Sequence, residues 1–159
     1  MPRTMQGLWR WASTNVTAAG GAVLTEDYLN DQLQNFYDNG AKGIDTIVAP
    51  ATQKRRIDKF AGSARRMEMM ANNVGTSVWE YEHSFSTKPT ARIILHPRMN
   101  ADHVLLFDSD MVAVAPFVPF FRKPLAEGGF YSKEGIHGEY ALEVHNELAV
   151  GKISGLSTA

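Results

Sequence analysis

A strict alternation of apolar and charged residues near the C-terminus is the feature that most constrains how this chain folds. The two sets of alternate positions are Tyr140, Leu142 and Val144 on one side and Glu139, Glu143 and His145 on the other. Successive side chains of a strand point to opposite faces, so this period of two predicts a long, half-buried β-strand running from about residue 135 to 149. A long strand with a charged outer face is unusual at the end of a small enzyme. It is typical of a flat subunit that meets its neighbours along an edge.

Composition excludes several classes of protein. The 159 residues suffice for one domain with a core. Lysine and arginine number 16 against 17 acidic residues, a net charge of −1, whereas a nucleic-acid-binding domain usually carries a basic excess. The absence of cysteine excludes disulfides, thiolate catalysis and cysteine zinc sites. No apolar run approaches the roughly 18 residues of a membrane span, and no signal-peptide core is present, so we expect no membrane partner.

The first half of the sequence predicts two helices around a short strand. Residues 25–39 are predicted to be helical because Thr25 suits the N-cap and Gly40 suits the left-handed position after the helix. The predicted apolar stripe of this helix comprises Leu29, Leu33, Phe36 and Tyr37. A strand follows at residues 44–49, and Pro50 opens the second helix, where its missing N–H costs nothing.

The second half is predicted to be mostly β. Strands are expected at residues 78–85, 91–96, 103–107 and 111–115, whereas residues 65–73 fit either a helical turn or a loop. Residues 116–124 hold too many prolines for a central strand. We therefore divide the chain into an irregular N-terminal segment (1–21), an α+β core (22–115), and strands with the C-terminus (116–159).

Two tryptophans, Trp9 and Trp11, stand among small and polar residues in the N-terminal segment. Tryptophan buries a large surface, so both need something to pack against. One interpretation is that they cover the edge of the domain's own core. The other is that they contact a further part of the protein or a neighbouring subunit.

Asp108-Ser109-Asp110, at the end of an apolar strand, is the strongest candidate for chemistry. It resembles the Asp-x-Asp motif with which glycosyltransferases hold a divalent cation on a nucleotide sugar. The same tripeptide is also a good turn, because aspartate and serine hydrogen-bond their own backbone. The turn is our preferred interpretation, since only one clear strand–helix pair precedes the motif. The alternative function is a small glycosyltransferase-like enzyme that uses Asp108 and Asp110.

No other pattern supports catalysis or a cofactor. The five histidines are scattered, and neither a nucleophile elbow nor a phosphate-binding loop occurs. A basic run comprises Lys54, Arg55 and Arg56. It is expected to be a solvated helix face, or a contact to an acidic patch such as Glu139, Glu143 and Glu147 on a neighbouring subunit.

Several segments together resemble one family, the major capsid proteins of tailed bacteriophages with the Hong Kong 97-type fold, in the branch of phage SU-ten. Each segment is weak alone, but their order and spacing extend over nearly the whole chain. The segments are TNV (14–16), LTEDYLN (24–30), IVAPATQKRRI (47–57), VLLFDSDMV (104–112), FFRKPL (120–125) and EYALEVHNELA (139–149).

The resemblance implies an axial domain, a helix-flanked sheet at residues 22–115, and long peripheral-domain strands from residue 116 onward. Family members are about twice as long, so their N-terminal arm, extended loop and spine helix would precede Met1. The implied partners are further copies in pentamers and hexamers, the missing N-terminal half or other capsid proteins, and packaged DNA nearby without specific binding. The implied location is the virion, with host cytoplasm during assembly. Candidate inter-subunit contacts are Lys54, Arg55, Arg56, Phe120, Phe121, Glu139, Glu143 and Asn146.

Our leading hypothesis is therefore a structural protein of a capsid shell, without enzymatic activity, catalytic residues, cofactor or metal. A glycosyltransferase-like enzyme is the alternative. A scaffold or decoration module that binds a shell made by another protein is a third hypothesis.

Overall fold

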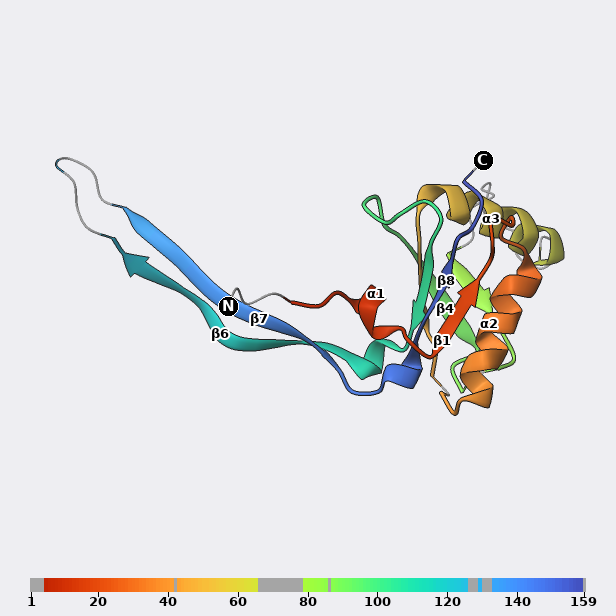
Figure 1. Cartoon of the computed structure of the whole chain (residues 1–159), viewed down its shortest axis with the longest axis horizontal. Coiled ribbons are helices and arrows are strands. Elements are labelled where there is room, and N and C mark those ends of the chain that lie inside the picture. Colours follow the sequence, from red (N-terminus) through yellow and green to blue (C-terminus); the bar gives the residue numbers. More distant parts are fainter. Residues whose placement is uncertain are drawn as a thin grey trace.

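The computed structural model describes residues 5–41, 43–65, 79–85, 87–125, 129 and 133–158, with the side chains of residues 61–65 left aside. Figure 1 shows two parts, a sheet with its helices and a long hairpin that extends away from it. Within the described part of the chain, no helix is long and apolar enough to cross a membrane.

A mixed six-stranded sheet forms the body of the molecule. Its strands lie in the order β1-β8-β5-β2-β4-β3, in which β1 and β8 are parallel, β2 and β4 are parallel, and the other pairs are antiparallel. Their bounds are β1 Asn15–Ala18, β2 Thr46–Ala49, β3 Glu80–Glu82, β4 Thr90–Leu95, β5 Val104–Phe107 and β8 Val150–Ser154. The last strand of the chain thus lies inside the sheet, between the first strand and β5.

The helices α2 (Glu26–Asp38) and α3 (Ala51–Arg65) close the main core against one face of the sheet. The predicted stripe is confirmed at Leu29, Leu33 and Phe36, but it is wrong at Tyr37, which is 58% exposed. Gln32 is buried instead. Its amide oxygen accepts from Thr17 Oγ1 (2.6 Å) and its nitrogen donates to the Asn15 carbonyl (3.2 Å), so its polar atoms are satisfied inside the core.

The opposite face of the sheet carries a smaller core. Ala12, Leu105 and Val150 are buried there, and the short helix α1 (Leu8–Trp11) packs Leu8 and Trp9 against them. This confirms the first interpretation of Trp9, cover for the domain's own core. Figure 1 shows α1 on the side of the sheet away from α2.

The hairpin consists of β6 (Val112–Pro124) and β7 (Glu134–Val144). The prediction of one half-buried strand up to residue 149 is wrong in two respects. The strand ends at Val144, and none of its described residues is buried, because only Val144 at its base packs against the smaller core of the sheet. The chain then turns and enters the sheet as β8, so residues 116–159 form no single unit, and the hairpin already begins at Val112.

Two of the sequence predictions fall partly outside the residues that the structure describes. The strand expected at residues 78–85 is present at Glu80–Glu82, whereas position 78 lies outside the described residues. Of residues 65–73, only Arg65 is described, as the last residue of α3.

Gly151 is a sensitive position of the sheet. A Cβ built there would lie 2.4 Å from Phe36 Cζ and 2.8 Å from the Asn15 carbonyl oxygen. We expect Gly151→Ala to lower the free energy of unfolding by about 2–3 kcal/mol, because backbone and a core ring must move together. Urea denaturation measures the loss. The control is Gly7→Ala, whose Cβ would have nothing within 4 Å and which should leave the stability nearly unchanged. Equal stabilities for the two variants would contradict this packing.

Candidate functional site

The hairpin is amphipathic. In its register Val114 is opposite Leu142 and Pro116 is opposite Tyr140, which places these side chains on one face. The Phe120 ring lies on the same face, with its centroid 4.8 Å from that of Tyr140. Alternation along β7 adds Ile136. We call this set the apolar face: Val114, Phe120, Ile136, Tyr140 and Leu142.

The other face of the hairpin is polar or small along β7, whereas β6 adds two apolar side chains to it, Val118 and Phe121. It carries Glu139 and Glu143 on β7, and Ala141 opposite Ala115. His137 lies there beside Phe121, with ring centroids 5.7 Å apart. We call this the polar face. The predicted separation of Tyr140, Leu142 and Val144 from Glu139 and Glu143 is confirmed.

In the described part of the chain, the apolar face is open to solvent except at Leu142, which is half-buried near the sheet. The exposed fractions are 66% for Val114, 70% for Phe120 and 69% for Ile136. Phe117, next to a shift in the strand register, is 75% exposed. A two-stranded hairpin is marginally stable alone, and a contiguous exposed apolar surface marks a site of interaction. The hairpin is therefore the candidate functional site.

Two short 3₁₀ turns join the hairpin to the sheet at what we call the root. The first, η1 (Ser109–Met111), precedes β6, and the second, η2 (Glu147–Ala149), follows β7. The side chains of Asp108 and Asn146 cap them, accepting from Asp110 N (3.1 Å) and Leu148 N (3.1 Å). The preferred interpretation of residues 108–110 as a turn is confirmed.

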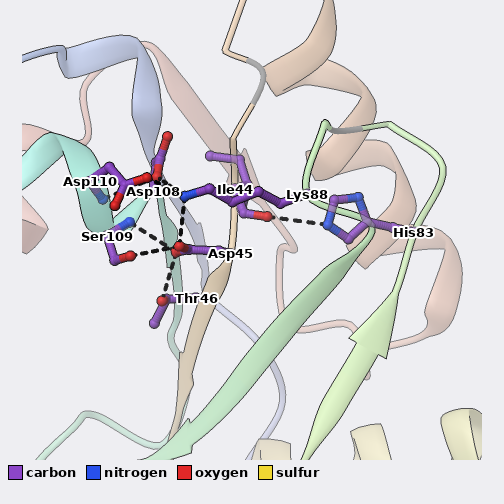
Figure 2. Close-up of polar contacts among 8 residues, drawn as sticks. All are labelled: Ile44, Asp45, Thr46, His83, Lys88, Asp108, Ser109 and Asp110. Carbon is purple, nitrogen blue, oxygen red and sulfur yellow. Dashed lines mark hydrogen bonds and ion pairs between the residues drawn. The ribbon is translucent and has the colours of Figure 1, made fainter.

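Lys88, from the loop between β3 and β4, fixes the first turn. Its ammonium lies 2.9 Å from Asp45 Oδ2, 2.8 Å from Asp108 Oδ1 and 2.7 Å from Asp110 Oδ2 (Figure 2). Asp45 also accepts from the Ser109 backbone N–H (2.9 Å) and the Ser109 hydroxyl (2.6 Å). The Lys88 ammonium thus stands among the carboxylates where the enzymatic alternative requires a divalent cation. Among the described residues, no group of three or more histidine, cysteine or acidic side chains is suited to hold a metal ion.

His83 fixes the base of the loop that carries Lys88. Its backbone N–H donates to the Pro89 carbonyl (2.9 Å), and its buried ring places Nε2 3.3 Å from the carbonyl oxygen of Ile44, next to Asp45 (Figure 2). Burial lowers the pKa of His83, and the contact to Ile44 opposes this only in part. A neutral ring at pH 7 suits this buried position.

The charges at the first turn make the root sensitive to acid. Burial alone would raise the pKa of Asp45, but hydrogen bonds from Ser109, Lys88 and Thr46 outweigh it and hold this pKa at about 2. A carboxyl group whose pKa is lower in the folded than in the unfolded protein stabilises the fold at a pH above its unfolded-state pKa. This stabilisation is lost as the pH falls toward and through the folded-state pKa. The window for Asp45 is therefore pH 3.8 to about 2.

We expect Asp45→Asn to lower the free energy of unfolding at pH 7 by about 2 kcal/mol, through weaker hydrogen bonds to a neutral amide. Between pH 4 and pH 2 the variant should lose less further stability than the parent, so the two curves converge. Urea denaturation of the variant and the parent across this pH range measures whether the two stability curves converge. Asp31→Asn, at an exposed position of α2, is the control and should follow the parent curve. Parallel curves for Asp45→Asn and the parent would contradict the assignment.

The sequence-predicted contact residues lie in different surroundings. Lys54 is buried, pairs with Asp58 and lies 4.9 Å from the Trp79 ring centroid. Arg56 donates to the Ser157 carbonyl (2.6 Å) and so holds the C-terminal segment, whereas Arg55 is exposed. Phe120 and Phe121 lie on opposite faces of the hairpin. Glu139 and Glu143 share its polar face, and Asn146 caps the second turn of the root.

Asp45 and Lys88 were not identified from the sequence as residues that fix the root. Glu147 was considered only as part of an acidic patch, and not as a residue that fixes the root. Glu147 accepts four hydrogen bonds from Ser13 and Thr14, which lie more than 130 positions away. Lys88 lies in a loop without any motif. The only local signals were the two capping patterns, Asp108-Ser-Asp110 and Asn146-Glu-Leu148, one residue before each turn.

Comparison with known proteins gives a family and a fold. The family model described as SU10 major capsid protein matches residues 1–157. No curated protein sequence matches the chain significantly. The structure resembles the SrpI encapsulin of Synechococcus elongatus PCC 7942 in its holo complex, with a TM-score of 0.61, 14% sequence identity and 96% of this chain covered. This likeness confirms the predicted α+β fold of the Hong Kong 97 type.

Two other solved structures match less closely. A virus-like particle from Pyrococcus furiosus has a TM-score of 0.47 at 12% identity over 89% of this chain, and Mycobacterium phage Che8 has 0.49 at 16% over 88%. The chain spans 57%, 56% and 53% of the length of the SrpI, Pyrococcus and Che8 chains, respectively.

Proposed function

Because the chain belongs to the SU10 major capsid protein family, we propose that it is a structural component of an icosahedral phage head shell. It acts through repeated contacts between copies, without catalysis. The observation that carries this proposal is the hairpin, which extends from the folded body with an apolar face that nothing described covers.

The hairpin is suited to contact another copy. It projects far beyond the sheet (Figure 1), so its apolar face is accessible to another molecule. The root joins it to the sheet through capped turns and an ion-pair cluster, so it projects in a defined direction. A contact between this face and a different surface of the next copy is head-to-tail, and repetition of such a contact closes rings. Pentamers and hexamers are the rings of the proposed shell.

The two parts of the molecule then have distinct roles. The six-stranded sheet with α2 and α3 corresponds to the axial domain around the ring axis, and residues 112–144 correspond to the peripheral domain. Arg55 on α3 and the acidic polar face carry opposite charges, which favour one register between neighbours more than they add affinity. We place the finished shell in the virion and its assembly in the host cytoplasm. Its near-neutral charge agrees with packaged DNA nearby but not specifically bound.

Self-association of the chain tests the proposal. Sedimentation velocity over a range of concentrations should show reversible association of the folded chain, and electron microscopy of the associated fraction should show rings or shell fragments. A folded monomer at every concentration would contradict it. So would electron micrographs in which the chain only decorates a lattice built by another protein.

A further inference from the structure

The segment before β1 is attached to the hairpin root and not only to the core. Ser13 donates to Glu147 Oε1 through its backbone N–H (3.0 Å) and hydroxyl (2.8 Å). Thr14 donates to Oε1 through its N–H (2.8 Å) and to Oε2 through its hydroxyl (2.9 Å). The neighbouring Asn15 donates through Nδ2 to the Leu148 carbonyl (2.6 Å). The turn that ends the hairpin is therefore bound to residues 13–15 by side chain and backbone alike.

The other end of this segment is held by one tryptophan. The Trp9 ring stacks on His103 with centroids 4.0 Å apart and planes 11° from parallel. The Lys152 ammonium lies 4.7 Å from the Trp9 ring centroid and donates to the Trp9 carbonyl (3.3 Å). Lys152 belongs to β8, the strand that follows the second turn of the root. The segment thus spans from the face of the sheet to the root.

Each leg of the hairpin has its own side-chain anchor, and two backbone hydrogen bonds join the legs at the root, from Asp108 N–H to the Ala149 carbonyl (3.0 Å) and from His145 N–H to the Met111 carbonyl (2.9 Å). The first turn is held by Lys88 from the loop between β3 and β4, and the second by Glu147 on residues 13 and 14. A two-stranded ribbon with one leg fixed can pivot about that leg, whereas two fixed legs define its direction. The four-residue helix α1 has little stability of its own, so its position depends on the Trp9 contacts.

We propose that residues 7–14 form a brace that sets the direction of the hairpin, and that displacing this brace lets the hairpin swing about its Lys88-bound leg. Glu147 is the positioning residue at one end of the brace, and Trp9 is the anchor at the other. Contacts made by residues 7–14 on the sheet are thereby coupled to the direction in which the apolar face points. The biological meaning of this coupling rests on the proposed function, but the direction of the hairpin is measured separately from assembly.

The absence of cysteine allows a direct test. Lys123→Cys on β6 and Tyr37→Cys on α2 replace two exposed side chains and allow nitroxide labels to be attached. Pulsed electron spin resonance then gives the distribution of distances between the two labels. Dilution with unlabelled protein removes distances between molecules. The full chain with its native brace should give one narrow distribution. Glu147→Ala and Trp9→Ala should each broaden it, and the double variant should be no broader than either single variant, because both substitutions release the same brace.

Three further variants separate positioning from stability. Glu147→Gln keeps an acceptor oxygen for Ser13 and Thr14 and should restore a distribution close to that of the parent. Glu143→Ala removes an exposed glutamate of the hairpin itself and should leave the distribution narrow. Thr14→Val removes one hydrogen bond and should broaden the distribution slightly even if Glu147→Ala fails to fold. Narrow, parent-like distributions for folded Glu147→Ala and Trp9→Ala would overturn the proposal, since Trp9 would then only cover the core.

Discussion

Phe120→Asp is expected to abolish self-association of the chain at concentrations where the parent associates, while the body of the protein stays folded. Phe120 is central in the apolar face and is 70% exposed, so its replacement removes no core contact of the sheet. A buried aromatic anchor of an interface contributes about 2 kcal/mol or more, roughly 30-fold in the association constant. A carboxylate buried unpaired in the contact adds a further desolvation cost.

The matched control for this variant is Ala141→Asp. It places the same carboxylate at an exposed position of the same hairpin, but on the polar face beside Glu139 and Glu143. Sedimentation velocity should show that it associates like the parent. Circular dichroism and urea denaturation confirm that both variants are folded. If the two substitutions weaken association equally, general repulsion between acidic hairpins explains the effect, and the apolar face has no special role.

Lys88→Ala is expected to be the most destabilising substitution at the root. It leaves the carboxylates of Asp45, Asp108 and Asp110 close together, and Asp108 is buried. Loss of one partner from a buried ion pair costs about 3–5 kcal/mol, but Lys88 is 34% exposed, so we expect about 2–3 kcal/mol after allowance for solvent screening. Urea denaturation at pH 7 measures this loss.

Repulsion among the three carboxylates makes the destabilisation depend on salt and pH. The defect of Lys88→Ala should shrink at high salt, and also below pH 4, where protonation removes the repulsion. Lys59→Ala, at an exposed position of α3, is the control and should change the stability by no more than about 0.5 kcal/mol. A Lys88→Ala variant as stable as Lys59→Ala would show that the cluster does not hold the root.

The sequence predicted the local elements better than their assembly. The helix at residues 26–38 was readable because its apolar spacing, Thr25 and Gly40 all lie within one segment. Strands β4 and β5 were likewise visible as short apolar runs. The burial of β7 could not be predicted from the sequence, because an alternating pattern indicates which residues share a face and does not indicate what covers that face. Its outer apolar residues, Ile136 and Tyr140, are exposed, and burial is partial and confined to the end near the root, at Leu142 and Val144.

Long-range polar contacts explain the remaining differences. No local pattern marks Lys88 as the partner of Asp45 and Asp108, which are 43 and 20 positions away. The contact of Glu147 with Ser13 joins opposite ends of the chain. The basic run at residues 54–56 predicts one solvated helix face, but its side chains point in different directions around the helix. Lys54 is buried as a result, whereas Arg55 is exposed.

Single cysteines on the two faces of the hairpin test the central claim most directly, since the chain has none of its own. Val114→Cys lies on the apolar face and Ala141→Cys on the polar face, and both positions are exposed in the isolated chain. The rate at which a water-soluble thiol reagent modifies each is measured in dissociated and in associated protein. If the apolar face is the contact between copies, association should strongly slow modification at position 114. Position 141 should stay nearly as reactive as before. Unchanged reactivity at position 114 in the associated protein would contradict it.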